Sequence, residues 1–394
     1  MTQKQQSNDI KTILLNAPLY SLGSYGRRSR EILNSLSQYK HDFTVRALIV
    51  NHFAYSNRIT LSESTKAFIE SYRVKEQFKD PYVEILVGPP PMLSPTGGAS
   101  ATICFTHGGG FSKIPANWVQ VLNTINATVV PSTHEREVFK ESGVNNVFSI
   151  SGITDKNIIK SKPQEGLLSD LKSAVDFTDS FIFLTTGRFK TDLGDPNGIL
   201  TAAKMFSNAF SKNRKHNAKL IIKTSLAGTN ELDKTMITNT FKSQFSAYDV
   251  DSKNIYFVHG EMTDDELAEL FNVSNAFISC ASASAWNYML FDAATYGLPT
   301  LVTGWGGHMD YINPKKSTVF EYELEDVGGF KRAKLEEEDI KRKMRRCIEK
   351  YSGAVERADN LKTDIRKQFA PDTVGPEIIH VINKILGKSS LILS

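Results

Sequence analysis

The sequence predicts an α/β protein built from two doubly wound parallel-sheet domains, and three observations predict it. Short continuous apolar runs recur along the chain and alternate with helical patterns, as is typical of strands buried on both faces of a parallel sheet. A polar, mixed stretch at 155–178 interrupts this order, after which the pattern begins again. The length of 394 residues also exceeds what one hydrophobic core usually fills.

The first domain is expected over residues 1–165. Its strands are predicted by apolar runs at 13–15, 45–50, 83–87, 101–106 and 127–131. A Gly-containing loop at 16–26 follows the first strand, and Ser29–Leu36 has the apolar spacing of a helix. A last helix, from about Glu377 to Leu386, follows two prolines and is expected to complete this domain over 373–394.

The second domain is expected over residues 178–370. Its strands are predicted by apolar runs at 181–185, 220–223, 255–259, 276–280 and 299–303. Helices are expected at 199–210, at 264–272 with Thr263 as the N-cap, and from about Asn287 to Tyr296.

Composition and charge restrict the classes of function. Hydrophobic residues make up 40% of the chain and charged residues 23%, which is ordinary for a globular protein. The net charge of +4 is compatible with an anionic ligand but is not the concentrated basic stripe of a nucleic-acid-binding protein, so no nucleic-acid partner is expected. A basic run at 341–346 follows three glutamates and is interpreted as a solvated helix face, the alternative being peripheral contact with a membrane.

The three cysteines, Cys104, Cys280 and Cys347, stand far apart, and the first two fall in apolar runs. They indicate buried free thiols in a reducing compartment, and their spacing matches no zinc site. The segment 1–9 is polar, and no apolar run approaches the length of a signal-peptide core or a membrane span. A cytoplasmic protein with no integral membrane segment is therefore expected.

The most informative stretch is residues 276–312. A buried strand ends at Cys280, opens into a loop of small residues at 281–285, and is followed by a helix. In open α/β sheets ligands bind outside the carboxyl ends of the strands, where a helix N-terminus offers N–H groups to hydroxyls or anions. Asp292 lies about two turns beyond Ser284, and a carboxylate there can accept two hydrogen bonds from a vicinal diol such as a ribose. The alternative is that Asp292 caps or pairs on a surface helix.

This stretch resembles the donor-binding signature of retaining glycosyltransferase family four, whose GT-B fold has two Rossmann-like domains facing across a cleft. Family members read E-G-W-G-L-P-x-L-E-A-M-A-x-G-x-P-V-I-x-T-x-W-G-G-H-x-D-Y. The resemblance covers roughly residues 80–315 of this chain. The positions in register with the signature are Trp286, Ala293, Gly297, Pro299, Thr303, Trp305, Gly306, Gly307, His308, Asp310 and Tyr311.

Two positions depart from the signature, because Ser284 replaces its first glutamate and Asp292 its second. The resemblance implies that the second carboxylate holds the nucleotide ribose, which Asp292 can do with a shorter arm. It also implies that the first position lies near the donor sugar, where Ser284 supplies no negative charge. The backbone N–H groups of Ala285, Trp286 and Asn287 are expected to hold sugar hydroxyls instead.

A second match is Thr185-Thr186-Gly187-Arg188, which follows a buried strand. The family reads G-R-x here, with Lys-Gly some residues on. The resemblance implies that Arg188 binds the donor diphosphate and stabilises the charge that develops on the leaving nucleotide. The alternative is an ordinary surface ion pair. Asn197 stands in the place of the lysine, so Lys190 or Lys223 is expected to substitute.

Two candidates lie in the first domain. Gly26 closes a Gly-x-x-Gly turn after the first strand, where exposed amides can meet a phosphate, although most such turns only need positive φ; Arg27 is the lesser candidate. His107 precedes three glycines at the end of the fourth strand, where the resemblance places a histidine that faces the donor sugar. The alternative is a histidine hydrogen-bonded in a tight turn.

Further candidates come from loops that the resemblance places near the ligand. His259 ends a strand before the donor helix and is expected beside the nucleobase, the alternative being a role in stabilising its loop. The stretch from Ile114 to Val144 also resembles the family's first domain, with Ser132 and Glu135 expected near the cleft.

The implied function is that of a retaining glycosyltransferase, which moves a hexose from a nucleoside-diphosphate sugar to a glycan or other hydroxyl acceptor. GDP-mannose and UDP-glucose both stay open as donors. His107, Arg188, Ser284 and Asp292 are the expected catalytic residues. No metal is expected, because positive side chains and helix termini would do the work of a cation.

Other classes of function compete with this one. Because Ser284 has replaced a carboxylate, the chain could be a catalytically weak or inactive nucleotide-sugar-binding protein. A sugar-nucleotide epimerase or phosphorylase on the same fold is a further alternative. A nicotinamide oxidoreductase is not expected, because no G-x-G-x-x-G follows the first strand.

Overall fold

The structure is a computed structural model of the 394-residue chain, and it divides into two compact units that are described separately. The first unit comprises residues 1–153 and 368–394, and the second comprises residues 154–367. The residues that the structure describes are 10–50, 61–75, 80–154, 168–189, 195–211, 216–225, 231–260 and 262–387.

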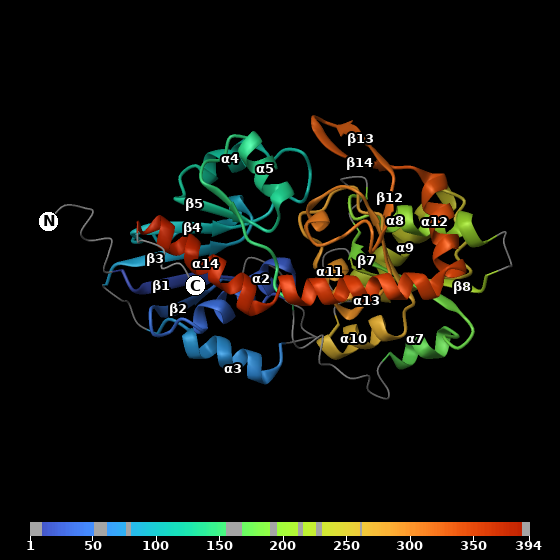
Figure 1. Ribbon diagram of the computed structural model, residues 1–394, viewed down its shortest axis with the longest axis horizontal. Helices are drawn as coiled ribbons and strands as arrows, with labels where there is room; N and C mark the ends of the chain where they lie inside the picture. The colour runs from blue at the N-terminus through green and yellow to red at the C-terminus, as the bar shows by residue number, and fades with distance from the viewer. Residues whose placement is uncertain are drawn as a thin grey trace. The chain divides into compact units, whose positions relative to one another are not determined.

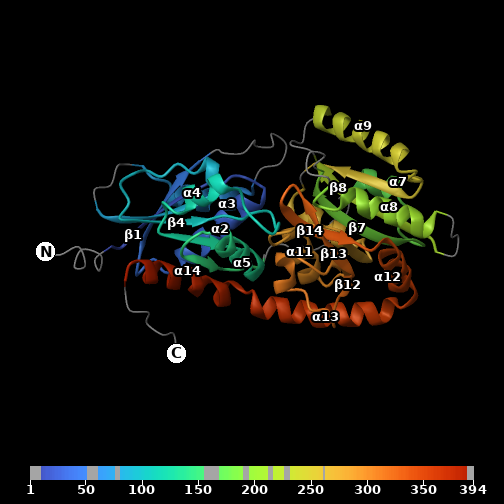
Figure 2. The ribbon, with the colours of Figure 1, turned by 90° about the horizontal axis from the view of Figure 1, so that it is seen from above.

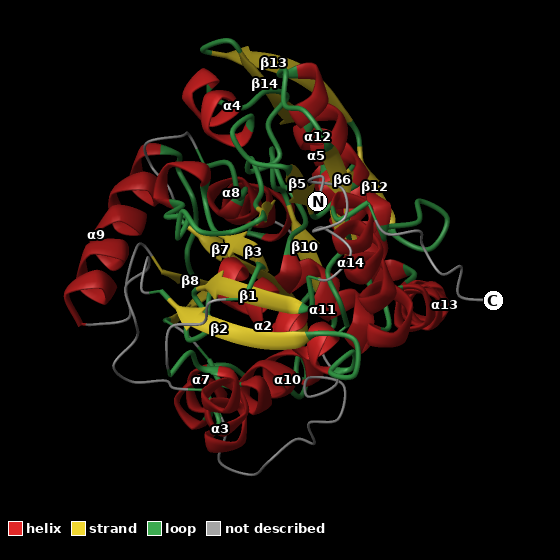
Figure 3. Cartoon of the chain, turned by 90° about the vertical axis from the view of Figure 1, so that its left-hand side faces the viewer, coloured by secondary structure: helices red, strands yellow, loops and turns green. Residues whose placement is uncertain are grey.

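The first unit contains a six-stranded parallel sheet in the order β2-β1-β3-β4-β5-β6, and Figure 3 shows β1 and β2 side by side. The five predicted strands are confirmed, and the short β6 is an addition. The strand order reverses between β1 and β3, so the switch point of this sheet lies beside the chain that leaves β1. The strands are β1 (Thr12–Ala17), β2 (Thr44–Ile49), β3 (Tyr82–Val87), β4 (Ala101–Phe105), β5 (Ala127–Val130) and β6 (Val147–Ser149).

Helices cover both faces of the first sheet. Cys104 belongs to an apolar cluster with α4 and α5, whereas the guanidinium of Arg28 in α2 lies over the ring of Phe105. Because neighbouring residues of a strand point to opposite faces, α2 covers the face opposite α4 and α5. The helix α14, red in Figure 1, lies against the blue α2 although the two are far apart in sequence. The helices are α2 (Ser24–Ser37), α3 (Glu63–Tyr72), α4 (Ala116–Leu122), α5 (Thr133–Glu141), α14 (Pro371–Ile385) and the 3-10 helix η2 (Pro90–Met92).

The second unit contains a six-stranded parallel sheet in the order β12-β11-β10-β7-β8-β9. All five predicted strands are confirmed, and β12 is an addition. The order runs outward in both directions from β7 and β10, so the switch point lies at the carboxyl ends of these two strands. The strands are β7 (Phe181–Arg188), β8 (Ala218–Ser225), β9 (Ile255–His259), β10 (Ala276–Ser279), β11 (Thr300–Thr303) and β12 (Thr318–Phe320).

One face of the second sheet carries an extensive apolar cluster, which α8, α9 and α12 close, and Figure 2 shows α9 lying over β8. The bounds of α8 and α10 agree with the prediction, and Thr263 forms a full capping box with Glu266. Among the described residues, no helix combines the length and apolar character needed to cross a membrane. The helices are α7 (Ser169–Ala174), α8 (Ile199–Phe210), α9 (Glu231–Ala247), α10 (Asp264–Asn272), α11 (Tyr288–Tyr296), the 3-10 helix η3 (Gly307–Asp310), α12 (Glu337–Glu349) and α13 (Tyr351–Gln368).

An antiparallel hairpin that the sequence analysis did not predict follows β12. It consists of β13 (Tyr322–Val327) and β14 (Phe330–Leu335), joined by Gly328 and Gly329, which both have positive φ. A Gly-Gly pair between two strands is a strong hairpin signal, because tight two-residue turns need positive φ. The hairpin is attached to the loop after β10, where the N–H of Ala333 donates to the carbonyl oxygen of Ser282 over 2.8 Å.

Candidate functional site

Two loops meet at the switch point of the second sheet, one after β7 and the other after β10. The N–H of Ser282 donates to the carbonyl oxygen of Pro196 over 2.9 Å. The two loops approach each other closely at Gly198, because a Cβ at this position would lie 2.0 Å from the carbonyl oxygen of Cys280. The two loops therefore form one framework around the switch point.

The N-terminus of α8 is occupied by a carboxylate of the chain itself. Asp195 accepts hydrogen bonds from the N–H groups of Ile199, Leu200 and Thr201 at 2.9, 2.8 and 3.1 Å. Burial raises the pKa of Asp195 to about 6, although these three donors act to lower it. Because this helix start is already neutralised, an external anion would have to bind elsewhere. Sequence reasoning missed this role, and the signal for it was an acidic residue just before the predicted helix.

The N-terminus of α11 is built differently, because a positive-φ residue begins it. Asn287 is the N-cap, with φ 62°; its Oδ1 accepts from Leu290 N and its Nδ2 donates to Ser279 Oγ, both at 3.2 Å. Asparagine tolerates this conformation better than other residues except glycine, and glycine stands here in the family signature. The hydroxyl of Tyr311 lies within 3.0 Å of the carbonyl oxygens of Trp286 and Asn287 and so supports the turn before α11.

The loop before α11 presents backbone donors. Among the described residues, no acceptor takes a hydrogen bond from the N–H of Ala285 or of Asn287. The side chains of Asn287, Tyr288 and Met289 are partly exposed, so the tip of α11 is open at these positions. An N–H at a helix start that no protein group occupies is suited to a hydroxyl or phosphate oxygen.

The side chain of Trp286 is part of the loop's own core. Only 2% of it is exposed, and its ring centroid lies 5.2 Å from that of Phe291 and 4.9 Å from that of Tyr311. His308 is also buried, with Nε2 2.7 Å from the carbonyl oxygen of Thr303. The aromatic and histidine positions of the signature thus shape the loop, and only the backbone of Trp286 could face a ligand.

Ser284 and Asp292 do not share a helix. The helix begins at Tyr288, so Ser284 lies in the preceding loop, where its carbonyl oxygen accepts from Gly307 N at 2.7 Å. Asp292 lies one turn beyond Tyr288 on the same helix face and is only 3% exposed. Asp292 therefore belongs to the buried part of α11, one turn beyond its partly exposed tip.

Arg188 and two neighbours lie on one face at the end of the sheet. Arg188 is exposed, and its guanidinium makes no hydrogen bond or ion pair among the described residues. Thr186 pairs in register with Lys223, so both side chains lie on the same face as Arg188. Leu184 of the same strand pairs with Phe277, which places Ser279 on this face as well.

Thr186 is a candidate that sequence reasoning missed. Its side chain is 9% exposed, and its buried Oγ1 has no hydrogen-bond partner. A buried hydroxyl without a partner is costly, and such a group needs an explanation such as a missing ligand. Only the strand register could reveal this position, because a threonine in an apolar run otherwise indicates nothing more than a strand.

Of the two lysines expected to replace the family's lysine, the structure describes one. Asn197 donates its side-chain amide to the carbonyl oxygen of Arg188 at 2.6 Å, so it holds the loop and adds no charge. Lys190 lies outside the described residues. Lys223 lies near the end of β8 on the Arg188 face.

His259 is turned toward a helix of its own unit. Its Nε2 lies 2.7 Å from Oδ2 of Asp233 in α9, and both side chains are mostly buried. This contact occupies one ring nitrogen and ties the end of β9 to α9, which agrees with the alternative of a loop-stabilising role.

In the first unit, the expected loop at 16–26 is shorter than predicted. The helix α2 begins at Ser24, so Gly26 lies in its first turn. A Cβ on Gly26 would lie 1.8 Å from the carbonyl oxygen of Ser21, which explains the glycine by packing and not by positive φ. His107 stacks on Tyr25 with ring centroids 4.4 Å apart, and its Nε2 lies 3.4 Å from Ser24 Oγ at the start of the same helix.

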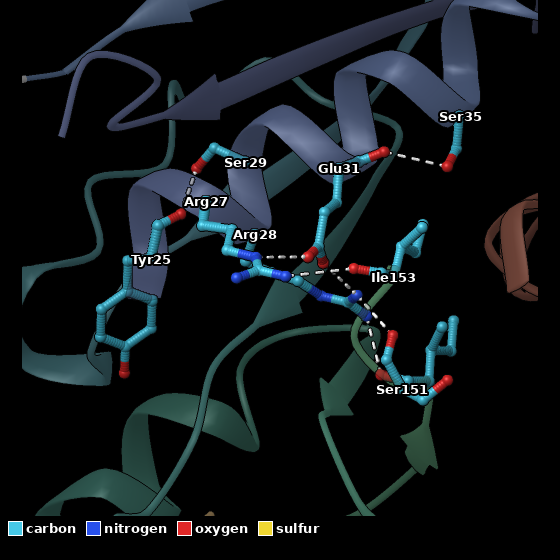
Figure 4. A network of polar contacts seen from close by, with 9 residues as sticks. Tyr25, Arg27, Arg28, Ser29, Glu31, Ser35, Ser151 and Ile153 are labelled. Carbon is cyan, nitrogen blue, oxygen red and sulfur yellow. Dashed lines mark hydrogen bonds and ion pairs between the residues drawn. The ribbon is translucent and has the colours of Figure 1, made fainter. Parts of the chain in front are cut away.

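The arginines of α2 bind the backbone of their own unit, as Figure 4 shows. Arg28 donates to the carbonyl oxygens of Ile150 and Ser151 at 2.8 and 2.6 Å. Arg27 donates to that of Ile153 at 3.3 Å, and both arginines pair with Glu31. The lesser diphosphate candidate, Arg27, is therefore already engaged.

Solved structures share the fold over nearly the whole chain. HepE from Anabaena in complex with UDP-glucose matches with a TM-score of 0.64 at 11% identity, covering 95% of this chain and 99% of its own. A glycosyltransferase from Rickettsia africae matches at 0.66 and 13%, covering 97% and 100%. Sucrose-phosphate synthase from Thermosynechococcus elongatus matches at 0.66 and 11%, covering 96% and 100%.

These structures establish that the chain has the GT-B fold of two six-stranded parallel sheets with interleaved helices. No protein-family model matches the sequence. No curated protein matches it either. At this level of identity the likeness concerns the fold, and function must be argued from the residues of the site.

Proposed function

We propose that the chain is a retaining glycosyltransferase that uses a nucleoside-diphosphate hexose as donor. The observation that carries this proposal is the set of unused polar groups at the switch point of the second unit. The guanidinium of Arg188, the hydroxyl of Thr186 and the N–H groups of Ala285 and Asn287 have no partner among the described residues. A cation and several donors at a switch point suit a pyrophosphate.

The proposed roles combine this placement with those that the resemblance implies. Arg188 and Lys223 bind the diphosphate, with the hydroxyl of Thr186 as a further donor, and Arg188 stabilises the charge that builds up as the bond to the sugar breaks. Asp292 accepts hydrogen bonds from the ribose. The N–H groups of Ala285 and Asn287 hold sugar hydroxyls. For the first unit, the family signature implies a role toward the sugar for His107 and a role toward the phosphate for the turn at Gly26.

The reaction breaks the bond between the anomeric carbon and a phosphate oxygen and forms one from that carbon to an acceptor hydroxyl on the same face. The hydroxyl proton goes to the leaving phosphate. No carboxylate stands at Ser284 to assist, so positioning and charge stabilisation are the main contributions of this chain. UDP-glucose and GDP-mannose are both donors to test, and UDP-glucose is the molecule bound in the similar structure of HepE.

The test is to titrate the protein with UDP, GDP and their common sugar derivatives by calorimetry and then to follow nucleotide release with hydroxyl acceptors. Arg188→Gln is expected to weaken binding of the preferred nucleotide at least about tenfold, since a hydrogen-bonded charge pair contributes more than a neutral contact. Arg346→Gln, an exposed arginine of the same unit, is the control and should bind like the wild type. Lack of binding to every nucleotide sugar would remove the proposal.

A second candidate function, a nucleotide-sugar-binding protein without turnover, is favoured by Ser284 alone. It predicts binding with no nucleotide release over any acceptor. In that case Ser284→Glu should produce turnover. If the wild type already transfers sugar, a carboxylate at this position is dispensable and the first proposal stands.

A further inference from the structure

A buried carboxylate of the first unit holds the glycine turn that follows His107. Glu135 is fully buried in the first turn of α5. Its Oε1 accepts a hydrogen bond from Gly110 N at 2.7 Å, and its Oε2 accepts one from Gly108 N. His134 adds a third contact, with Nε2 3.1 Å from the carbonyl oxygen of Gly110.

At the start of α5, Glu135 does not make the hydrogen bond that a glutamate at this position of a capping box usually makes. Ser132 and Glu135 have the spacing of a capping box, in which the glutamate would bond back to the N-cap N–H. Ser132 makes its hydrogen bond of the capping box, since its Oγ accepts from Glu135 N at 3.2 Å. The carboxylate instead takes its two backbone donors from the turn at 108–110, whereas the equivalent pair in α10, Thr263 and Glu266, closes the box in both directions.

Each glycine of the turn is needed for this arrangement. Gly109 and Gly110 have φ of 84° and 86°, which side chains rarely adopt. A Cβ on Gly108 would lie 2.7 Å from Ile114 and 3.0 Å from Phe139. The N–H groups of Gly108 and Gly110 can both reach one carboxylate only because the backbone turns this tightly. The turn is therefore held in this conformation by Glu135 of α5.

The turn at 108–110 also determines the position of the His107 ring. The hydroxyl of Tyr25 lies 3.5 Å from the carbonyl oxygen of His107 and 3.3 Å from Thr106 Oγ1. The rings of Tyr25 and His107 are stacked, at an interplanar angle of 11°. The backbone of 106–110 thus decides where the imidazole meets the start of α2.

We propose that Glu135 is a positioning residue, which fixes the turn at 108–110 and thereby holds the imidazole of His107 against Tyr25 for its role toward the donor sugar. The last clause rests on the proposed function, whereas the hold on the turn does not. The ionised carboxylate makes the stronger acceptor for both N–H groups. Burial raises the pKa of Glu135 to about 7, so this hold should weaken as the pH falls below neutrality.

The first test needs no substrate. Amide exchange of Gly108 and Gly110, corrected for intrinsic rate, and the imidazole signals of His107 are measured by NMR in the wild type and in Glu135→Gln. A glutamine offers only one acceptor oxygen, so exchange at one or both amides should rise about tenfold and the His107 signals should shift. The control is Glu137→Gln on the same helix, whose carboxylate is exposed and should leave both unchanged. Unchanged amides and unchanged His107 signals in Glu135→Gln would overturn the proposal.

A pH series on the wild type keeps the test valid if the variant folds poorly. Protection of the two amides should fall as the pH is lowered from about 8 to 6. Tyr25 interacts electrostatically with Glu135, and His134 contacts the carbonyl oxygen of Gly110 in the same turn. His107, which stacks on Tyr25, is the other titratable side chain beside this turn. His134→Gln is therefore measured in parallel, and the pH effect should persist in it. Protection that does not change with pH in the wild type, or a pH effect that disappears in His134→Gln, would contradict the assignment.

The last arm separates this inference from the proposed function. With the preferred donor, Glu135→Gln should lower kcat about tenfold with little change in KM, because the nucleotide-binding groups of the second unit are untouched. An altered turn with unchanged kcat would overturn the positioning role. If the wild type turns over no donor, the proposed function fails, while the exchange measurements still decide whether Glu135 holds the turn.

Discussion

Asn197 donates its side-chain amide to the carbonyl oxygen of Arg188 over 2.6 Å. The bond closes the loop between β7 and α8 at the position where the resemblance places a lysine. The guanidinium of Arg188 has no partner among the described residues, so the asparagine shapes the backbone beneath a cation that is available to a ligand. At this position Asn197 therefore supplies a hydrogen bond and no positive charge.

Two substitutions at Asn197 should separate the effect of the loop's conformation on nucleotide binding from the effect of charge beside Arg188. Asn197→Ala removes the hydrogen bond and should weaken nucleotide binding only about two- to threefold, since a neutral bond of this kind contributes about 1 kcal/mol. Asn197→Asp also loses the donor and adds a negative charge beside Arg188, so binding should weaken about tenfold and recover in part at high salt. Calorimetry at two salt concentrations measures both. Equal losses in the two variants would show that Arg188 does not meet the ligand's charge.

Asn287 should tolerate glycine better than alanine. Asn287→Gly keeps the positive φ without strain and loses mainly the side-chain cap, whereas Asn287→Ala loses the cap and must adopt φ 62° with a Cβ. The alanine variant should therefore be less stable than the glycine variant by about 1–2 kcal/mol in urea unfolding. A glycine variant that proved the less stable would mean that backbone strain at this helix start is negligible.

Local signals account for the parts of the fold that the sequence predicts well. Thr263, followed three residues later by Glu266, marks the start of α10 because the capping box lies within one turn. The strands β7 and β10 could be predicted from their apolar runs alone, without knowing which strands lie beside them. The hairpin was missed because the adjacent charged pairs Glu325-Asp326 and Lys331-Arg332 break the apolar alternation of a strand, although Gly328-Gly329 marks its turn.

Contacts between distant residues explain what sequence reasoning could not supply at the site. Tyr311, 24 residues beyond Asn287, supports the turn at which α11 starts, so Ser284 fell outside the helix. Thr186 became a candidate only when the register showed its face and its unpartnered hydroxyl. Glu135 was expected near the cleft, but its contact with a glycine turn 25 residues earlier depends on how α5 packs against β5 and β6.

Gly198 should be among the least replaceable residues of the second unit. Its φ is 70°, and a Cβ would lie 2.0 Å from the carbonyl oxygen of Cys280, so Gly198→Ala must separate the loops after β7 and β10. A loss of at least about 3 kcal/mol is expected, together with loss of nucleotide binding. Gly353→Ala in α13 is the control: its Cβ would meet only Arg357 at 3.7 Å, and stability should be unchanged or should rise by about 0.5–1 kcal/mol. A mild effect at Gly198 would mean that the two loops are not held as one framework.

Asp195 should make the second unit less stable as the pH rises from about 4 to 6. Its pKa is raised from 3.8 to about 6 in the folded protein, so in this range the folded state binds more protons than the unfolded state. The contribution of this group to the free energy of unfolding is therefore largest below the unfolded pKa and is lost as the pH rises through the folded pKa.

Asparagine at this position cannot ionise but can still cap α8 through its side-chain oxygen. The difference in unfolding free energy between the wild type and Asp195→Asn should thus fall by about 2 kcal/mol between pH 4 and pH 7, as urea titrations at several pH values would show. The exposed Asp170→Asn serves as the control, with a difference that changes little over the same range. A difference for Asp195→Asn that rises with pH would mean that the three N–H donors outweigh burial, and the α8 start would then favour a negative charge more strongly than its buried position suggests.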